Sequence, residues 1–144
     1  MYLVDVNILV YAANRQDPHH EKAVGWLEVA LAGPGQTVGL PWSSLLGYMR
    51  IVTNPRLFKV PSPSPDAWAV IEDWLQRPAA WTPLPGPRHI AHLERQMREV
   101  RPTANLVSDA ELAALATQHA LTVVTADQGF TRFADIKVLN PLAN

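Results

Sequence analysis

The stretch that decides the fold is MYLVDVNILVYA, residues 1–12. Apolar residues run straight into Asp5, and a second apolar run follows at once. Both runs are typical of a protein core, and an unpaired charge between them is costly to bury. We interpret YLVD as a buried strand that ends at Asp5, and residues 6–14 as a short helix. Some other part of the chain must therefore stabilise the carboxylate of Asp5.

Segments of helix and strand type alternate along the rest of the chain. Asp17-Pro18 indicates a helix start, because a capping side chain precedes a proline at the first helical position. The expected helices cover about residues 18–31, 42–54, 65–76, 87–100 and 106–120, with a helical turn at 128–134. The expected later strands lie within residues 37–41, 79–85, 121–127 and 136–139. This alternation predicts an α/β fold with a mostly parallel sheet.

Length and composition narrow the class of protein. A chain of 144 residues suits one domain, 1–144, with a real core. The sequence has no cysteine, which excludes disulfides and thiol catalysis and suits a reducing compartment, so we expect a cytoplasmic protein. A net charge of -1 gives no global attraction to nucleic acid, so such binding must come from a local patch. No apolar run approaches the ~18 residues of a membrane span.

Acidic residues stand where two of the expected strands end. Asp5 ends the first strand, and Asp127 ends the apolar stretch LTVVTAD. If both strands are central and parallel, these carboxylates face one crevice, because ligands of open α/β sheets bind outside the carboxyl ends of the strands. Asp109 is a third candidate. It lies in the first turn of the expected helix that precedes the strand ending at Asp127.

Three converging carboxylates would repel one another, and a divalent cation would neutralise them. Oxygen ligands without cysteine or a histidine pair favour Mg²⁺ or Mn²⁺ over zinc. Magnesium commonly bridges to substrate phosphate. The constellation therefore indicates phosphoryl transfer, in which a metal ion activates water.

Each acid also has a purely structural interpretation. Ser108, Asp109 and Glu111 have the spacing of a capping box, so both acids would merely cap a helix. Asp5 and Asp127 would equally cap the helices that follow them. The joint pattern favours a metal site, because all three positions would otherwise have to be coincidental.

Four blocks of sequence, in this order, resemble the PIN-domain ribonucleases, and in particular the VapC toxins of bacterial toxin–antitoxin pairs. The blocks are LVDVNILVYA (3–12), LPWSSLLGYMRIVTNPRLF (40–58), LVSDAELAALATQHALTVVTADQGFTRF (106–133) and NPL (140–142). Together they span nearly the whole chain. The second block ends in a TNPR-F signature that resembles one VapC subfamily.

The resemblance implies a PIN-like, three-layer α/β/α fold with about four or five short strands. It places Asp5, Asp109 and Asp127 at metal-binding and catalytic positions, with Asn7 as the small polar residue two positions after the first acid. It further implies Mg²⁺-dependent endoribonuclease action on structured cellular RNA, homodimerisation, and inhibition by a cognate VapB-type antitoxin. Base reading in single-stranded loops would set which RNA is cut.

Asn7, Arg50 and Thr125 are candidates for contact with substrate or for support of the acids. Arg50 is placed to reach a phosphate or to pair with an acid of the site, and an ordinary surface arginine would fit as well. Thr125 precedes Asp127 by two residues, so both point to one side of the strand, where a hydroxyl could orient a water at the metal.

One position departs from the resemblance. Many PIN nucleases carry a further glutamate on the third helix, near Gly47 of this chain. Glycine inside a helix costs about 1 kcal/mol relative to alanine, so we interpret Gly47 as making room beside the metal or substrate. The site then has three acids, or it borrows another such as Glu111.

Two other functions remain open on the sequence alone. A PIN-like domain that has lost activity would bind RNA or a protein partner, and Gly47 supports this alternative. An aspartyl-phosphate hydrolase would use Asp5 as its nucleophile. That chemistry needs a second acid two residues later, where this chain has Asn7.

Overall fold

The computed structural model describes residues 1–143, and its helices and strands alternate as the sequence predicts. In chain order they are β1 (Tyr2–Val4), α1 (Val6–Ala13), α2 (His20–Leu31), β2 (Val38–Gly39), α3 (Trp42–Val52), α4 (Ser64–Gln76), β3 (Ala80–Trp81), α5 (His89–Glu99), α6 (Asn105–His119), β4 (Thr122–Val124), the 3₁₀ helix η1 (Gln128–Arg132) and β5 (Val138–Leu139). The strands are only two or three residues long. The expected α/β fold is confirmed.

The five strands form one sheet in the order β3-β2-β1-β4-β5, and every neighbouring pair is parallel. From the central β1 the chain adds β2 and β3 on one side, and it later adds β4 and β5 on the other. The strand order therefore reverses between β1 and β4. Such a reversal leaves a crevice outside the carboxyl ends of the two strands, which is the usual ligand site of this architecture.

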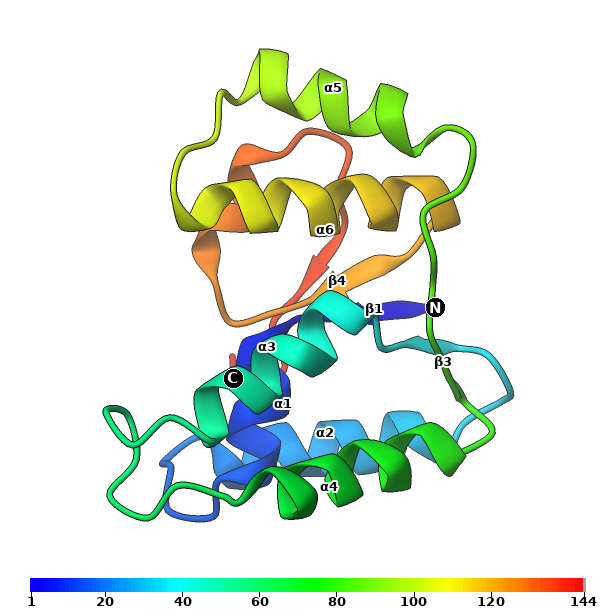
Figure 1. Ribbon diagram of the computed structural model, residues 1–144. Helices are drawn as coiled ribbons and strands as arrows, with labels where there is room; N and C mark the ends of the chain where they lie inside the picture. The colour runs from blue at the N-terminus through cyan, green and yellow to red at the C-terminus, as the bar shows by residue number, and fades with distance from the viewer. Residues whose placement is uncertain (144) are drawn as a thin grey trace.

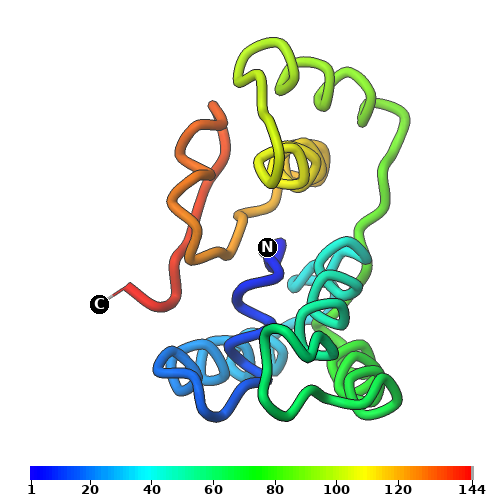
Figure 2. Tube along the Cα trace, turned by 60° about the vertical axis from the view of Figure 1, so that its left-hand side comes forward, coloured from blue at the N-terminus to red at the C-terminus, as the bar shows by residue number. Residues whose placement is uncertain are grey.

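Helices cover both faces of the sheet, which gives three layers (Figure 1). Adjacent residues of β1 point to opposite faces: Leu3 belongs to a core shared with α6, and Val4 belongs to a core shared with α1 to α4. Figure 2, which views α6 nearly along its axis, shows α5 outside α6 and helices α1, α2 and α4 on the other side of β1. None of the described helices has the length and apolar character needed to cross a membrane.

Helices α1 and α3 approach closely beside the end of β1, and Gly47 permits this contact. A Cβ atom at position 47 would lie 2.7 Å from Cγ2 of Val6. Gly47 does make room, as expected, but the Val6 side chain takes that space rather than a metal or substrate. The same contact leaves no room for a glutamate there unless α1 and α3 move apart.

This contact generates a prediction about stability. Gly47→Ala should destabilise the protein by up to about 2 kcal/mol, because overpacking costs about 1–3 kcal/mol and the gain in helix propensity offsets only about 1 kcal/mol of it. The measurement is urea unfolding followed by circular dichroism.

Gly25 provides a matched control, since it lies inside α2 and a Cβ atom there would meet nothing within 4 Å. Gly25→Ala should therefore stabilise the protein by about 0.5–1 kcal/mol. Combining Gly47→Ala with Val6→Ala should remove the clash, so the double variant should be no less stable than Val6→Ala alone. A stable Gly47→Ala single variant would contradict the close α1–α3 contact.

Candidate functional site

A cleft of about 740 Å³ opens at the crevice where the strand order reverses. Helices α1, α3 and α6 form its walls. Asp5 enters it directly after β1, Asp127 enters from beyond β4, and Asp109 enters from α6. The structure therefore brings together three acids that are far apart in the sequence.

Asp5 is almost buried, with 9% of its surface exposed. Its Oδ1 accepts a hydrogen bond from the backbone N–H of Val6 at 2.7 Å. Its Oδ2 accepts from the Thr125 hydroxyl at 2.8 Å and from the Asn7 amide at 3.2 Å. Burial raises the pKa of Asp5; the charge of Asp127 adds to this effect, and the three hydrogen bonds oppose it.

Asn7 and Thr125 fix Asp5 and connect it to the backbone near Asp127. The Asn7 amide nitrogen donates to the Thr125 hydroxyl at 3.0 Å, and its amide oxygen accepts from the N–H of Ala126 at 3.1 Å. The N–H of Asp127 donates to the Thr125 hydroxyl at 3.0 Å. The Thr125 hydroxyl donates to Asp5 and accepts from two groups, so its hydrogen-bonding capacity is filled. It orients the carboxylate of Asp5 rather than a water molecule.

Asp109 carries the largest electrostatic perturbation of the three acids. Burial, the charges of Asp5 and Asp127, and a hydrogen bond with Asp127 raise its pKa from 3.8 to about 7. Below this pKa, Asp109 is neutral and does not add to the negative charge of the cleft. Above this pKa, Asp109 is a carboxylate repelled by its two neighbours.

The capping interpretation of the acids holds for two of them. Asp5 caps α1 through the N–H of Val6, and Asp127 caps η1 through the N–H of Gly129 at 2.8 Å. For Asp109 the interpretation is wrong, as is its placement in a first turn. Helix α6 begins at Asn105, so Asp109 is its fifth residue.

The helix starts within one residue of the predicted position 106, so Ser108 lies inside the helix rather than at its end. The capping box expected at Ser108 and Glu111 therefore does not form at the helix end. Glu111 lies instead 3.4 Å from the imidazole Nε2 of His89 on α5, and it does not line the cleft. It is not placed to replace a missing acid.

Arg50 lies in the cleft on the α3 wall, exposed to solvent. Among residues 1–143 no ion pair holds it. The other residues of the α3 wall are uncharged: Ser43, Ser44, Leu46, Gly47 and Ile51. The acids come from α6 and the strand ends. The cleft therefore has an acidic side and a side whose only ionised group is Arg50.

The donor chemistry of the cleft fits a hard divalent cation, because carboxylate oxygens are preferred Mg²⁺ ligands and a cation would relieve their repulsion. The side chains of residues 1–143 do not, however, include three acids or histidines already arranged around one metal position. Asp5 and Asp127 each use an oxygen for a helix cap. Each capping oxygen accepts one N–H and keeps a lone pair for a cation. A cation would therefore compete mainly with the proton on Asp109.

The repulsion predicts a pH-dependent effect of Asp109→Asn on the metal-free protein. The folded state raises the pKa of Asp109, so it binds the proton more tightly than the unfolded state, and stability falls as pH rises from about 4 to about 7. Removing the charge should raise the free energy of unfolding at pH 8 by about 1–3 kcal/mol, allowing for partial exposure.

The gain in the free energy of unfolding from Asp109→Asn should be small at pH 4, where the carboxyl group of Asp109 is also neutral in the wild type. Chemical unfolding in EDTA at both pH values measures it. Asp66→Asn is the control, because Asp66 is exposed in the first turn of α4, outside this cleft. An equal gain at both pH values would show that Asp109 is not repelled by its neighbours.

The hydrogen-bond network predicts that Thr125→Val destabilises the protein by about 1–3 kcal/mol, since three groups lose a buried partner. The loss should be larger at pH 8 than at pH 4, because the Thr125 hydroxyl stabilises the ionised form of Asp5. Thr125→Ser keeps the hydroxyl and should lower the free energy of unfolding by less than Thr125→Val does. If valine is tolerated as well as serine at pH 8, the hydroxyl does not hold Asp5.

Comparison with known proteins places this geometry in a family. A family model described as PIN domain matches residues 2–136. Ribonuclease VapC37 of Mycobacterium tuberculosis is 40% identical over 143 residues, which cover 99% of each chain. Ribonuclease VapC25 of the same organism is 36% identical over 98% of this chain and 99% of its own. VapC ribonuclease Mb2897 of Mycobacterium bovis is 39% identical over 99% of this chain and 96% of its own.

Solved structures share the fold at lower identity. A chain in the structure of FitAB bound to an IR36 DNA fragment has a TM-score of 0.69 at 22% identity, covering 100% of this chain and 97% of its own. A chain of VapBC2 from Rickettsia felis, bound to a promoter DNA fragment, has a TM-score of 0.70 at 17% identity. The match covers 96% of this chain and 97% of its own. Because the family model covers most of the chain and the sequence relatives cover nearly all of it, the chain belongs to the PIN-domain family, among the VapC ribonucleases.

Proposed function

We propose that this VapC ribonuclease, the toxin of a VapBC toxin–antitoxin system, hydrolyses phosphodiester bonds of structured cellular RNA with Mg²⁺, for which Mn²⁺ can substitute. Asp5, Asp109 and Asp127 are its metal-binding and catalytic residues. The single observation that carries this proposal is the electrostatic coupling of three carboxylates in one cleft, where burial and mutual repulsion raise the pKa of Asp109 to about 7.

The surrounding residues have defined tasks in this proposal. When bound, a divalent cation supplies activation of water and stabilisation of the charge that develops on the phosphate. Thr125 and Asn7 hold the carboxylate of Asp5 in position through their hydrogen bonds. Arg50 binds a phosphate oxygen of the RNA from the opposite wall, where no acid among residues 1–143 pairs with it.

The proposal extends to partners and subfamily. The TNPR-F signature, Thr53 to Arg56 with Phe58, assigns the chain to one VapC subfamily. A cognate VapB-type antitoxin inhibits the toxin, and the toxin acts as a homodimer in the cytoplasm. The structure of VapBC2 from Rickettsia felis, bound to promoter DNA, supports the partner by analogy of fold.

The test is cleavage of total RNA by purified protein with Mg²⁺. Asp5→Asn should lower the rate at least about 100-fold, because it removes a carboxylate from the site that stabilises the transition state. EDTA should abolish cleavage by the wild type. Asp66→Asn, an acid outside the cleft, should cleave like the wild type. Equal cleavage by Asp5→Asn and wild type would refute the assignment.

A PIN-like domain that binds without cleaving is the second candidate. The contact between Val6 and Gly47, which hinders an acidic side chain at position 47, favours it. Calorimetric titration with Mg²⁺ in the presence of RNA separates the two, because the second candidate predicts partner binding without metal binding. The aspartyl-phosphate hydrolase has no such support, since Asn7 is engaged with Thr125 and Ala126 and offers no acid.

A further inference from the structure

Ser44, in the first turn of α3, is a buried polar residue whose side chain has no partner in the fold. Only 1% of its surface is exposed. Its backbone N–H donates to the carbonyl of Pro41 at 3.0 Å, but among residues 1–143 no group forms a hydrogen bond with its hydroxyl. Enclosing a hydroxyl without a partner costs free energy, so packing alone does not explain a serine here.

The unpartnered hydroxyl of Ser44 opens into the acidic cleft, because Ser44 is one of the residues that line it. Within residues 1–143, the fully enclosed side-chain atoms without partners belong to Trp81, His89, Gln96 and Gln118. The hydroxyl oxygen of Ser44 is not one of them, so it is accessible from the cleft. A group bound in the cleft can therefore supply the missing hydrogen bond.

Two features of the fold place Ser44 close to Asp5. The register between β1 and β2, continued by two residues, brings Pro41 to the level of Asp5, and Ser44 is bonded to Pro41 in the first turn of α3. Gly47 lies three residues after Ser44, so the two share a face of the helix. Gly47 contacts Val6, the residue that follows Asp5. Ser44 therefore belongs to the part of the α3 wall that adjoins the first acid.

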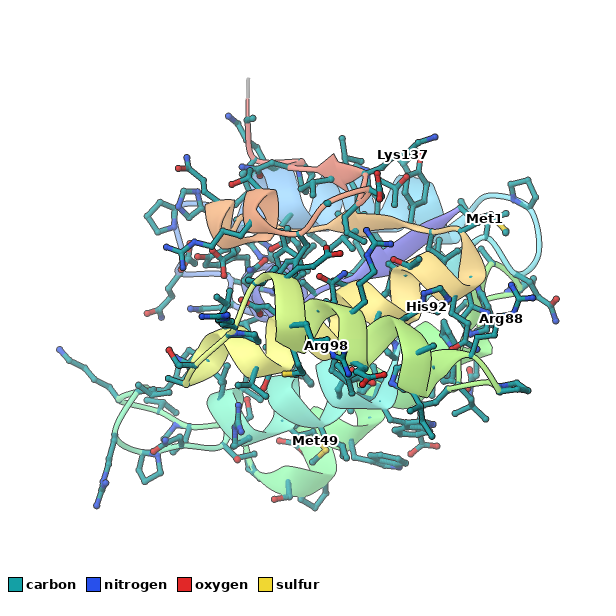
Figure 3. All side chains as sticks on the ribbon, turned by 90° about the horizontal axis from the view of Figure 1, so that it is seen from above. Met1, Met49, Arg88, His92, Arg98 and Lys137 are labelled. Carbon is teal, nitrogen blue, oxygen red and sulfur yellow. The ribbon has the colours of Figure 1, made fainter. Side chains whose placement is uncertain are left out.

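Charge selects a cation rather than an anion as the group that meets this hydroxyl. The three acids of the cleft would repel an anion placed next to Asp5, and they attract a cation. Arg50, the basic residue that lines the cleft, follows Ser44 by six residues, which is about 9 Å along the helix axis. Arg88 and Arg98, labelled in Figure 3, project from α5 and do not line the cleft.

We infer that the hydroxyl of Ser44 helps to hold the divalent cation of the cleft, by accepting a hydrogen bond from one of the waters that the cation keeps. Mg²⁺ usually keeps several waters when carboxylates bind it, and a serine oxygen has lone pairs to accept from one of them. A neutral oxygen adds no repulsion to the three acids, unlike a glutamate on the same wall. The inference rests on the proposed function in taking a divalent cation as the occupant of the cleft.

The experiment titrates Mg²⁺ by calorimetry into the full chain, freed of metal with EDTA and dialysed, at pH 8 without RNA. Ser44→Ala should weaken Mg²⁺ binding about tenfold, since loss of a group that hydrogen-bonds a metal ligand costs about 10–100-fold in affinity. Ser44→Cys keeps the side-chain volume but has a weak hydrogen-bonding group, so it should weaken binding similarly. Ser64→Ala is the control, because Ser64 is exposed in the first turn of α4 outside the cleft, and it should change the affinity less than twofold.

Urea unfolding separates this role from a purely structural one. In EDTA, Ser44→Ala should unfold at the same urea concentration as the wild type or at a higher one, because it removes a buried hydroxyl that has no partner. Mg²⁺ should raise the unfolding midpoint of Ser44→Ala less than that of the wild type, since a ligand stabilises the folded state according to its affinity. A lower midpoint in EDTA with a wild-type response to Mg²⁺ would show that Ser44 only packs α3, and the inference would be wrong.

The outcomes also distinguish this inference from the proposed function. If Ser44→Ala binds Mg²⁺ like the wild type, the inference is overturned, while cleavage of RNA by the wild type would still support the ribonuclease. If Ser44→Ala weakens Mg²⁺ binding but the wild type cleaves no RNA, the inference holds and the proposed function fails. Absence of Mg²⁺ binding by the wild type overturns the inference and favours the candidate that binds without cleaving.

Discussion

The hydrogen bond from the Thr125 hydroxyl to the Asp5 carboxylate joins the ends of the two central strands, and the geometry of the cleft depends on it. Asp5 is nearly buried, so its charge needs donors that the protein itself supplies. Thr125, Asn7 and the N–H of Val6 provide them. The same threonine also accepts from the N–H of Asp127, so one side chain sets the positions of two acids.

Bringing three carboxylates together in the cleft lowers the stability of the folded chain. Donors offset the burial of Asp5, but Asp109 meets two other acids with no described cation among its partners, and its pKa rises to about 7. The chain tolerates this conflict because Asp109 can hold a proton and become neutral. Clusters of this kind are costly for folding and are typical of sites that act on charged ligands.

The sequence predicted the α/β fold and the three acids because both depend on local patterns: alternating helix and strand segments, and carboxylates at strand ends. The adjacency of β1 and β4 was an assumption, since periodicity does not encode strand order. The start of α6 was predicted to within one residue, whereas the capping box at Ser108 was wrong because Ser108 lies inside the helix, three residues after Asn105. The role of Gly47 was misassigned because its partner, Val6, is distant in the sequence and adjacent only in the fold.

The contact between Gly47 and Val6 also has an electrostatic consequence for the cleft. A glutamate at position 47 would stand three residues before Arg50 on α3, a spacing at which opposite charges pair on a helix. Such a pair would neutralise Arg50 and make the α3 wall acidic. With Val6 occupying that space, the wall keeps a positive charge opposite the three acids. The cleft is therefore polarised across its width, so a phosphate is attracted to the α3 side while a cation is attracted to the other. Under the proposed function, a phosphodiester in the cleft would have its phosphate on the Arg50 side.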